Sequence, residues 1–199
     1  MKDAKPVTKP SEPKEKTLLK DEPVKVPKKH DKLLEVRRAE LQKYDKDKEH
    51  YKDVAFNQKT GGLKATHKRH NFNGVGEKYE IHVQNAAFKA GHSVIFGDES
   101  QHAYKKRFIE GLFDNMDFEV AGKESVTENS ILRGLKHCAS KRTTEVAVLD
   151  FPYGGFNEET LRNAIIRYRG LKPLNDGQFL QFKKLVCVQN EEIVLEEDF

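Results

Sequence analysis

The sequence predicts an α+β fold in which helices flank a central, mostly antiparallel sheet, preceded by a disordered arm and a charged helix. Three observations lead to this prediction. Several apolar runs, such as residues 146–149, have the length of a strand. Two segments, 77–90 and 158–170, repeat apolar residues at helical spacing. The first 28 residues show no apolar pattern that could bury a face.

The N-terminal third is expected to lie outside the main domain. Residues 1–28 are rich in Lys, Pro and Glu and are interpreted as a disordered linker, of the kind that joins a preceding module. Residues 29–60 are interpreted as a charged helical extension, with a helix from about Lys29 to Val54 and a narrow apolar stripe. The folded domain then spans 61–199. A chain of 199 residues is long enough for one ordinary domain and such an extension.

The positive charge belongs mostly to the N-terminal third. Residues 1–70 carry 20 Lys and Arg against 12 Asp and Glu, a balance of +8, whereas the whole chain carries +4. Residues 71–199 are therefore net acidic, at −4. The basic pI of about 8.9 alone does not indicate a nucleic-acid-binding core.

The predicted elements of the domain follow from local patterns. Gly91 and Gly170 close two helices, and Thr127 can cap a third, whose apolar face carries Ile131, Leu135 and Cys138. The tetrapeptide 114–117 has turn composition and predicts a tight hairpin. In chain order we expect a helix at 77–90, strands at 92–96, 112–113 and 118–120, a helix from 129, a strand at 146–149, a helix at 158–170, and strands at 182–189 and 193–195.

Cysteine content and hydropathy exclude several classes of protein. The two cysteines, Cys138 and Cys187, lie in apolar patterns and are interpreted as small core residues, so we expect no disulfide scaffold. No apolar run is long enough for a membrane span or the core of a signal peptide. A cytoplasmic protein is the default expectation.

A compact basic cluster lies between two pairs of chain-breaking residues, Gly61-Gly62 and Asn73-Gly74. It contains the substrate-binding candidates Lys64, His67 and His70. Surface charge and phosphate contact explain it equally well, since histidines flanked by cations also suit acid–base work on a phosphodiester. No further Cys or His pair follows at zinc spacing, so no metal site is predicted.

A second polar group surrounds the predicted hairpin and the helix after it. Glu119 alternates with two apolar neighbours, Lys123 follows it, and Asn129, Ser130 and Arg133 open the helix. A carboxylate, two cations and small donors at a helix N-terminus suit a phosphate-bearing substrate. Residue types alone favour a simpler explanation, in which Glu119 is exposed and forms a surface ion pair with Arg133.

One sequence pattern goes further than residue types. It consists of Asp114 and Glu119 on the hairpin, Asn129-Ser130-Ile131 opening the helix, Ala139, and the strand 146–150 that ends in Asp. This pattern resembles the BECR-type (barnase–EndoU–colicin–RelE-like) nuclease domains of bacterial polymorphic and contact-dependent toxins, which are also fused to phage minor head proteins. The likeness covers about residues 61–195. The family pattern has a lysine two residues after the glutamate, where this chain has Ala121 and then Lys123.

The resemblance implies a toxin-like endoribonuclease that cleaves RNA, often tRNA, by metal-independent acid–base catalysis and without a cofactor. It implies Glu119 and Arg133 as catalytic residues, Asn129 and Ser130 as substrate donors, and Lys123 in place of the family lysine. His137, on the same helix face as Arg133, joins the catalytic candidates on chemical grounds. The implied partners are RNA, an immunity protein, and a phage head or toxin-delivery protein that could carry the domain into a target cell; no membrane partner is expected.

Two other classes fit the same sequence. The strand order also resembles the PD-(D/E)xK core of restriction endonucleases, in which Asp114 and Glu119 would hold Mg²⁺. The third class is a structural or partner-binding module with a degenerate nuclease fold, for example in a phage particle. The net acidic balance of residues 71–199 favours this third class.

Overall fold

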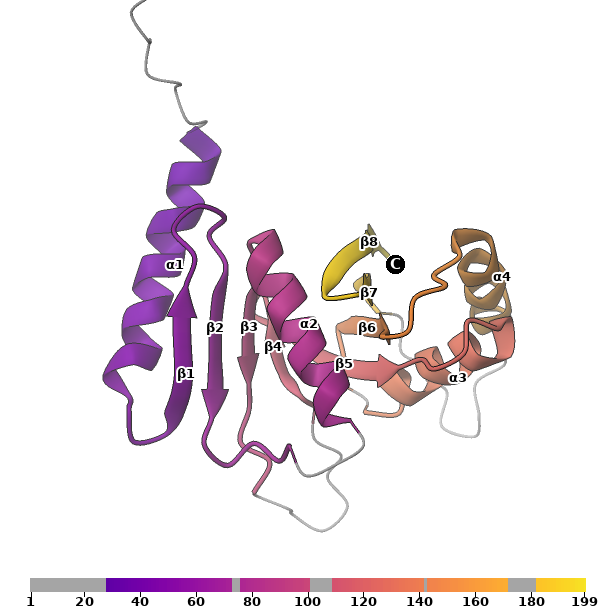
Figure 1. Ribbon diagram of the computed structural model, residues 1–199, viewed down its shortest axis with the longest axis horizontal. Helices are drawn as coiled ribbons and strands as arrows, with labels where there is room; N and C mark the ends of the chain where they lie inside the picture. The colour runs from indigo at the N-terminus through magenta and orange to yellow at the C-terminus, as the bar shows by residue number, and fades with distance from the viewer. Residues whose placement is uncertain (1–27, 73–75, 101–108, 142, 172–181) are drawn as a thin grey trace, which may run out of the picture.

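A computed structural model describes residues 28–72, 76–100, 109–141, 143–171 and 182–199. The predicted linker 1–28 thus lies, except for its last residue, outside the described residues. Eight strands form one sheet, and their order in the sheet is their order in the chain (Figure 1). The elements are α1 (Lys28–Lys46), β1 (Tyr51–Phe56), β2 (Leu63–His67), α2 (Glu77–Ala90), β3 (Ser93–Phe96), β4 (Gly111–Phe113), β5 (Met116–Gly122), α3 (Glu128–Ala139), β6 (Val146–Phe151), α4 (Glu158–Arg169), β7 (Lys184–Gln189) and β8 (Glu192–Asp198).

The sheet is mixed, as its connections require. Strands joined by a helix are parallel, namely β2 with β3, β5 with β6 and β6 with β7. The other four neighbouring pairs are antiparallel. The predicted α+β class, with a mostly antiparallel sheet and flanking helices, is therefore confirmed.

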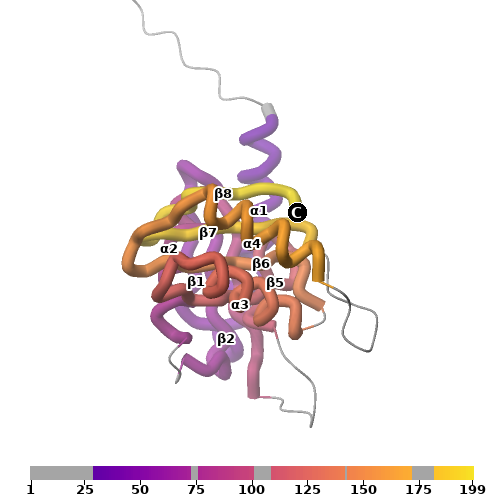
Figure 2. The backbone as a smooth tube through the Cα atoms, turned by 90° about the vertical axis from the view of Figure 1, so that its right-hand side faces the viewer, coloured from indigo at the N-terminus to yellow at the C-terminus, as the bar shows by residue number. Residues whose placement is uncertain are grey.

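Alternation along the strands distributes the core between two faces. On β6, Val146 and Val148 pack with α2, whereas Ala147 and Leu149 pack with α3 and α4. All of residues 146–149 are buried, which confirms the predicted strand covered on both faces. Figure 2 views the molecule from the side on which α3 and α4 lie. Helix α1 packs through Tyr44 on the face of β2 and β3 opposite α2.

The helical crossovers have opposite hands. Strands β2, β3, β5, β6 and β7 all run in the same direction, and each crossover advances the same way along the sheet. Helix α2 covers one face and helices α3 and α4 cover the other. The crossover through α2 must therefore differ in hand from the other two, although crossovers of this kind are right-handed in about 98% of cases.

The predicted helix from Lys29 to Val54 is wrong beyond Lys46. The helix ends at Lys46 and the chain turns into β1. The reason is that Tyr51, Val54 and Phe56 pack against the cluster around Tyr44, while β1 pairs with β2. A bulge between Lys52 and Ala55 interrupts this pairing.

The basic cluster contains a strand that was not predicted. Leu63 and Ala65 of β2 are fully buried, because β2 pairs with β1 on one side and β3 on the other. With five residues and a lysine among them, β2 has too short a pattern for recognition from sequence. From residue 77 onward the order of elements agrees with the prediction.

The β4–β5 hairpin is tighter than predicted. Its turn consists of two residues, Asp114 and Asn115, with φ of 49° and 65°, rather than four. Positive φ at both central positions is typical of the two-residue hairpin turns that match the strand twist. The shorter turn sets the register of the hairpin, so that Gly111 lies opposite Phe118.

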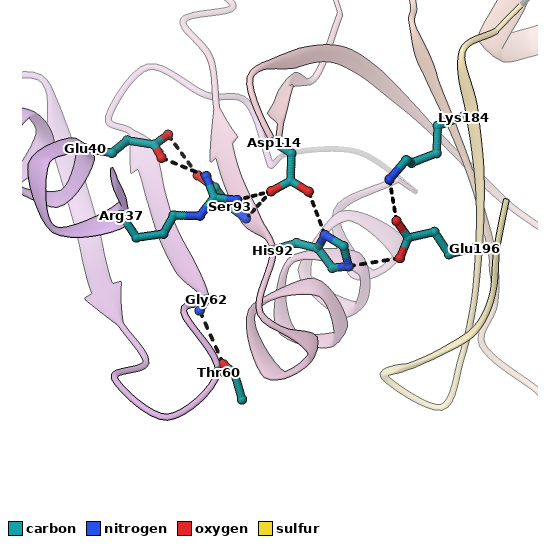
Figure 3. A network of polar contacts seen from close by, with 9 residues as sticks. All are labelled: Arg37, Glu40, Thr60, Gly62, His92, Ser93, Asp114, Lys184 and Glu196. Carbon is teal, nitrogen blue, oxygen red and sulfur yellow. Dashed lines mark hydrogen bonds and ion pairs between the residues drawn. The ribbon is translucent and has the colours of Figure 1, made fainter. Parts of the chain in front are cut away.

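A polar network ties α1 and β8 to this turn (Figure 3). The buried Arg37 forms an ion pair with Asp114. Asp114 also contacts His92 Nδ1 at 2.7 Å and accepts a hydrogen bond from the backbone N–H of Ser93 at 2.9 Å. His92 Nε2 lies 3.1 Å from a carboxylate oxygen of Glu196 on β8. The network connects elements from both ends of the sheet.

The edge strand β8 has alternating exposure and is acidic, with Glu192, Glu196, Glu197 and Asp198 among its seven residues. No helix in the described ranges combines the length and the apolar character that crossing a membrane requires.

Candidate active site

The candidate site lies where β5 continues beyond β4. The last residue pair between these strands is Gly111 with Phe118, and β5 extends four residues further, to Gly122. A pocket of about 420 Å³ opens along this extension. Helix α2 reaches the pocket with its N-terminal turn, and α3 with its C-terminal end. The lining residues are Gly76, Tyr79, Glu80, Glu110, Glu119, Val120, Ala121, Gly122, Lys123, His137 and Lys141.

Three carboxylates from three different elements meet in this pocket. Glu119 is fully buried, and among the described residues neither of its carboxylate oxygens has a hydrogen-bond partner. Glu110 precedes β4, and the hairpin register places it opposite Glu119. Glu80 comes from the first turn of α2. Burial, together with the charges of Glu119, Glu80 and Glu99, raises the pKa of Glu110 to about 9.

His70 completes the carboxylate cluster from the loop after β2. Its side chain is fully buried, and its ring stacks on Phe96 with centroids 4.5 Å apart. His70 Nε2 lies 3.1 Å from a carboxylate oxygen of Glu80. One donor atom each from His70, Glu80 and Glu110 lie within 4.8 Å of one another. One imidazole and two carboxylates, held rigidly at this spacing, form a donor set that suits a divalent cation.

Cationic groups approach Glu119 from the end of α3. His137 Nε2 lies 2.9 Å and Lys141 Nζ 3.3 Å from the same oxygen, Oε1. Neither contact has hydrogen-bond geometry. His137 is half exposed, whereas Lys141 is mostly covered. The pocket therefore contains an imidazole and an ammonium beside Glu119, in addition to its carboxylate cluster.

Lys123 lines the same pocket from the loop after β5. Its Nζ donates to the backbone oxygen of Ser130 at 3.5 Å, and its side chain lies over Gly134 so closely that a Cβ there would be 2.9 Å from Lys123 Cε. Burial lowers the pKa of Lys123. Two lysines, Lys123 and Lys141, thus line the pocket, whereas the position at which the nuclease resemblance would place a lysine is Ala121.

The structure brings together three of the four predicted catalytic residues. Glu119, Lys123 and His137 line the pocket, whereas the exposed Arg133 donates from Nε to the backbone oxygen of Asn129. The proposed surface pair of Glu119 with Arg133 is wrong, because Glu119 is buried and pairs with His137 and Lys141. Helix α3 runs back along β5, so its C-terminal end lies beside Glu119.

The predicted substrate donors at the N-terminus of α3 lie away from the pocket lining. Asn129 Oδ1 accepts a hydrogen bond from Arg167 at 2.9 Å, and the backbone N–H of Ser130 donates to the Thr127 side chain at 3.3 Å. These contacts secure the start of α3 and its packing with α4. Their role as substrate donors stays a prediction.

Of the basic cluster in the sequence, only His70 reaches the carboxylates. Lys64 Nζ donates to Asn85 Oδ1 at 3.3 Å on the outer side of α2. His67 stacks on His50 with centroids 5.9 Å apart. Alternation along β2 and the turn after it send these side chains in different directions.

Asp114 does not belong to the site. It lies in the hairpin turn, where it pairs with Arg37 and His92, at the opposite end of the hairpin from Glu110. The predicted pair of metal-binding carboxylates, Asp114 and Glu119, is therefore wrong. With the predicted four-residue turn, Glu110 would not lie opposite Glu119. The two-residue turn changes the register of the hairpin and brings the two residues opposite each other.

Three residues of the site were not predicted, although each had a signal in the sequence. Glu80 shares a helical face with Val83 and Ala87, so that an acid lies in an apolar stripe. Glu110 lies opposite Glu119 once the hairpin turn is reduced to two residues. Lys141 follows His137 by four residues, in the turn directly after α3, and both side chains reach the same oxygen of Glu119.

Comparison of the chain with protein-family models, with curated proteins and with solved structures finds no match. The chemistry of the site therefore has to be derived from its own residues. Buried carboxylates, an imidazole and two lysines in one pocket are suited to binding a cation and a phosphate side by side.

Proposed function

We propose that this protein is a nuclease that hydrolyses a phosphodiester bond with the help of a divalent cation bound at Glu80, Glu110 and His70. The observation that carries the proposal is the convergence of these residues in one pocket with the fully buried Glu119, beside which His137 and Lys141 lie. Of the two nuclease classes that the sequence suggested, this is the cation-dependent one that resembles restriction endonucleases, with Glu110 in place of Asp114.

The charge of the site supports a cation. Burial, and after it the charges of Glu119, Glu80 and Glu99, raise the pKa of Glu110. Buried acids of this kind either hold protons or need positive charge nearby. Phosphates would be repelled by the cluster in its ionised form, whereas a bound cation neutralises the carboxylates and attracts phosphate.

In this proposal the bound cation and the surrounding side chains have different chemical roles. A divalent cation in such a site acts as a Lewis acid and lowers the pKa of bound water. The imidazole of His70 favours Mn²⁺ over the harder Mg²⁺, which prefers oxygen ligands. Lys123 and Lys141 would stabilise negative charge on the phosphate, and His137 can move a proton at Nε2 beside Glu119.

The proposal is tested by cleavage assays with plasmid DNA, single-stranded DNA and total tRNA. We expect cleavage with Mn²⁺ or Mg²⁺ and none in EDTA. Glu110→Gln and Glu80→Gln should each lower the rate by about 100-fold or more, because even residues that only support metal ligands contribute roughly 10- to 100-fold. The matched control is Glu77→Gln, an exposed carboxylate one turn before Glu80 on the same helix, which should cleave like the wild type.

Metal binding can be measured without substrate. Mn²⁺ should raise the Tm of the wild type, by an amount equivalent to roughly 2.7 kcal/mol when its concentration is about 100 times Kd, and should leave the Tm of Glu110→Gln almost unchanged. A Tm that does not respond to Mn²⁺, Mg²⁺ or Zn²⁺ would contradict the metal site.

One observation favours a second function, the metal-independent endoribonuclease. His137 Nε2 lies 2.9 Å from Glu119 Oε1, and such a pair can remove a proton from a ribose 2′-hydroxyl and return it to a leaving oxygen. Cleavage of tRNA that persists in EDTA and is lost in His137→Gln would support this function over the first. If no nucleic acid is cleaved under any condition, both nuclease proposals are wrong and the chain is a binding module.

A further inference from the structure

Beside the pocket, the structure presents an aromatic ring to solvent. Among the Phe and Tyr residues that the structure describes, only Tyr153 is exposed, with 69% of its surface accessible to solvent. The ring follows β6 at the end of the sheet where β5 and its pocket-lining residues also end. An exposed aromatic ring beside a pocket can serve as part of a binding surface.

Hydrogen bonds order the backbone on both sides of Tyr153. The backbone N–H of Gly154 donates to the oxygen of Phe151 at 3.1 Å, which closes a tight turn around the tyrosine. Just beyond it, the backbone N–H of Phe156 donates to the Gln189 side chain at 2.7 Å. A ring held on such a turn loses little conformational entropy on binding.

Lys78 connects this ring to the pocket wall. Its Nζ donates to the hydroxyl of Tyr153 at 3.0 Å and lies 5.2 Å from the centre of that ring. The same ammonium lies 4.8 Å from the ring centre of Tyr79, which lines the pocket. Lys78 is 43% exposed, so its charge is accessible to a ligand that enters the pocket.

We infer that Tyr153 and Lys78 form a docking platform for an unpaired nucleotide next to the cleavage pocket. This inference rests on the proposed function and names its substrate class, nucleic acid with a single-stranded stretch. An exposed ring stacks any unpaired base, whereas a base within a duplex is already stacked on its neighbours. The ammonium of Lys78 is placed to contact the adjoining phosphate.

The ring should contribute more than the charge. Glu124 lies 3.5 Å from the ammonium of Lys78 and accepts a hydrogen bond from the hydroxyl of Tyr79 at 3.0 Å. This carboxylate partly offsets the attraction of Lys78 for phosphate. Removal of the ring is therefore the more sensitive test of the platform.

The test is fluorescence anisotropy in EDTA with a labelled single-stranded oligothymidylate of about 12 nucleotides, which spans one binding site, and with a duplex of the same length. We expect the wild type to bind the single strand more tightly than the duplex. Tyr153→Ala should weaken single-strand binding roughly tenfold, since one stacked base contributes about 1–3 kcal/mol. Tyr153→Phe keeps the ring and should stay within about threefold of the wild type. The control is Ile166→Ala, an equally exposed apolar side chain on α4.

The outcomes separate this inference from the proposed function. Equal affinity for single strand and duplex, or wild-type binding by Tyr153→Ala, would overturn the platform. Because binding is measured in EDTA, a chain that binds through Tyr153 but does not cleave contradicts only the nuclease proposal. A chain that cleaves with the same KM after Tyr153→Ala contradicts only the platform.

Discussion

At the scale of the residue, Glu110 shows how the fold alters chemistry. Burial and three neighbouring carboxylates raise its pKa from 4.5 to about 9. The folded state therefore holds the proton more tightly than the unfolded state does. The associated stability is fully present below about pH 4.5 and is lost as the pH rises through about 9.

This linkage gives a prediction for Glu110→Gln, in which the side chain keeps its shape and cannot ionise. In EDTA, the Tm of the wild type should fall more between pH 6 and pH 9 than that of the variant. The difference should be at least about 2 °C, which corresponds to roughly 1 kcal/mol in a domain of this size. Calorimetric Tm values of both proteins across this range provide the measurement, with Glu77→Gln as the control. Parallel pH curves for the wild type and Glu110→Gln would refute the raised pKa.

At the scale of the element, the start of α3 is secured by its cap. The side-chain oxygen of Thr127 accepts a hydrogen bond from the backbone N–H of Ser130 at 3.3 Å. Thr127→Ala leaves that N–H unpaired and should lower the free energy of unfolding by about 0.5–2 kcal/mol in urea titrations. Thr143→Ala, at an exposed threonine beyond the other end of α3, should change it by less than about 0.5 kcal/mol. Similar losses in both variants would argue against a specific cap.

Elements with a regular apolar pattern were predictable, and those without it were not. The cap at Thr127 and the core positions Ile131 and Leu135 follow from helical spacing, and all three are as expected. Strands β1 and β2 are short, and only β2 is largely buried, because α1 packs on it and it lies between β1 and β3. Their existence depends on contacts between distant segments, which a local pattern does not contain.

The candidate site was only partly predictable for the same reason. Glu119, Lys123 and His137 lie within one strand–helix unit, so their proximity follows from local structure. Glu80 and Glu110 come from segments 30 residues apart, and the order of strands in the sheet brings them together. The sequence also does not indicate which face of the sheet α2 covers, nor that its crossover differs in hand from the other two.

At the scale of the molecule, the network around Asp114 determines whether α1 stays on the sheet. Arg37→Met removes the ion pair to Asp114 and keeps an apolar side chain of similar length. The free energy of unfolding should fall by about 1.5–3 kcal/mol, the range for hydrogen bonds to charged groups. Hydrogen exchange should accelerate in α1 and β1, while β5 to β7 stay protected.

Arg38→Met is the matched control for that experiment, because Arg38 is exposed on the next position of α1. It should leave both stability and exchange nearly unchanged. If Arg37→Met exchanges like the wild type throughout α1, the apolar contacts of Tyr44 alone hold the helix in place.

The two edge strands of the sheet differ in how they disfavour pairing with a second copy of the chain. An open sheet offers unpaired backbone groups at both ends, where a second molecule could add its own strand. Here β1 is interrupted by a bulge and packs beneath α1, and β8 carries four acidic side chains. Two of these acids, Glu196 and Glu197, pair with Lys184 and Arg162 of the same chain. Bulges and charged side chains at the edges are features that disfavour pairing between the sheets of two copies.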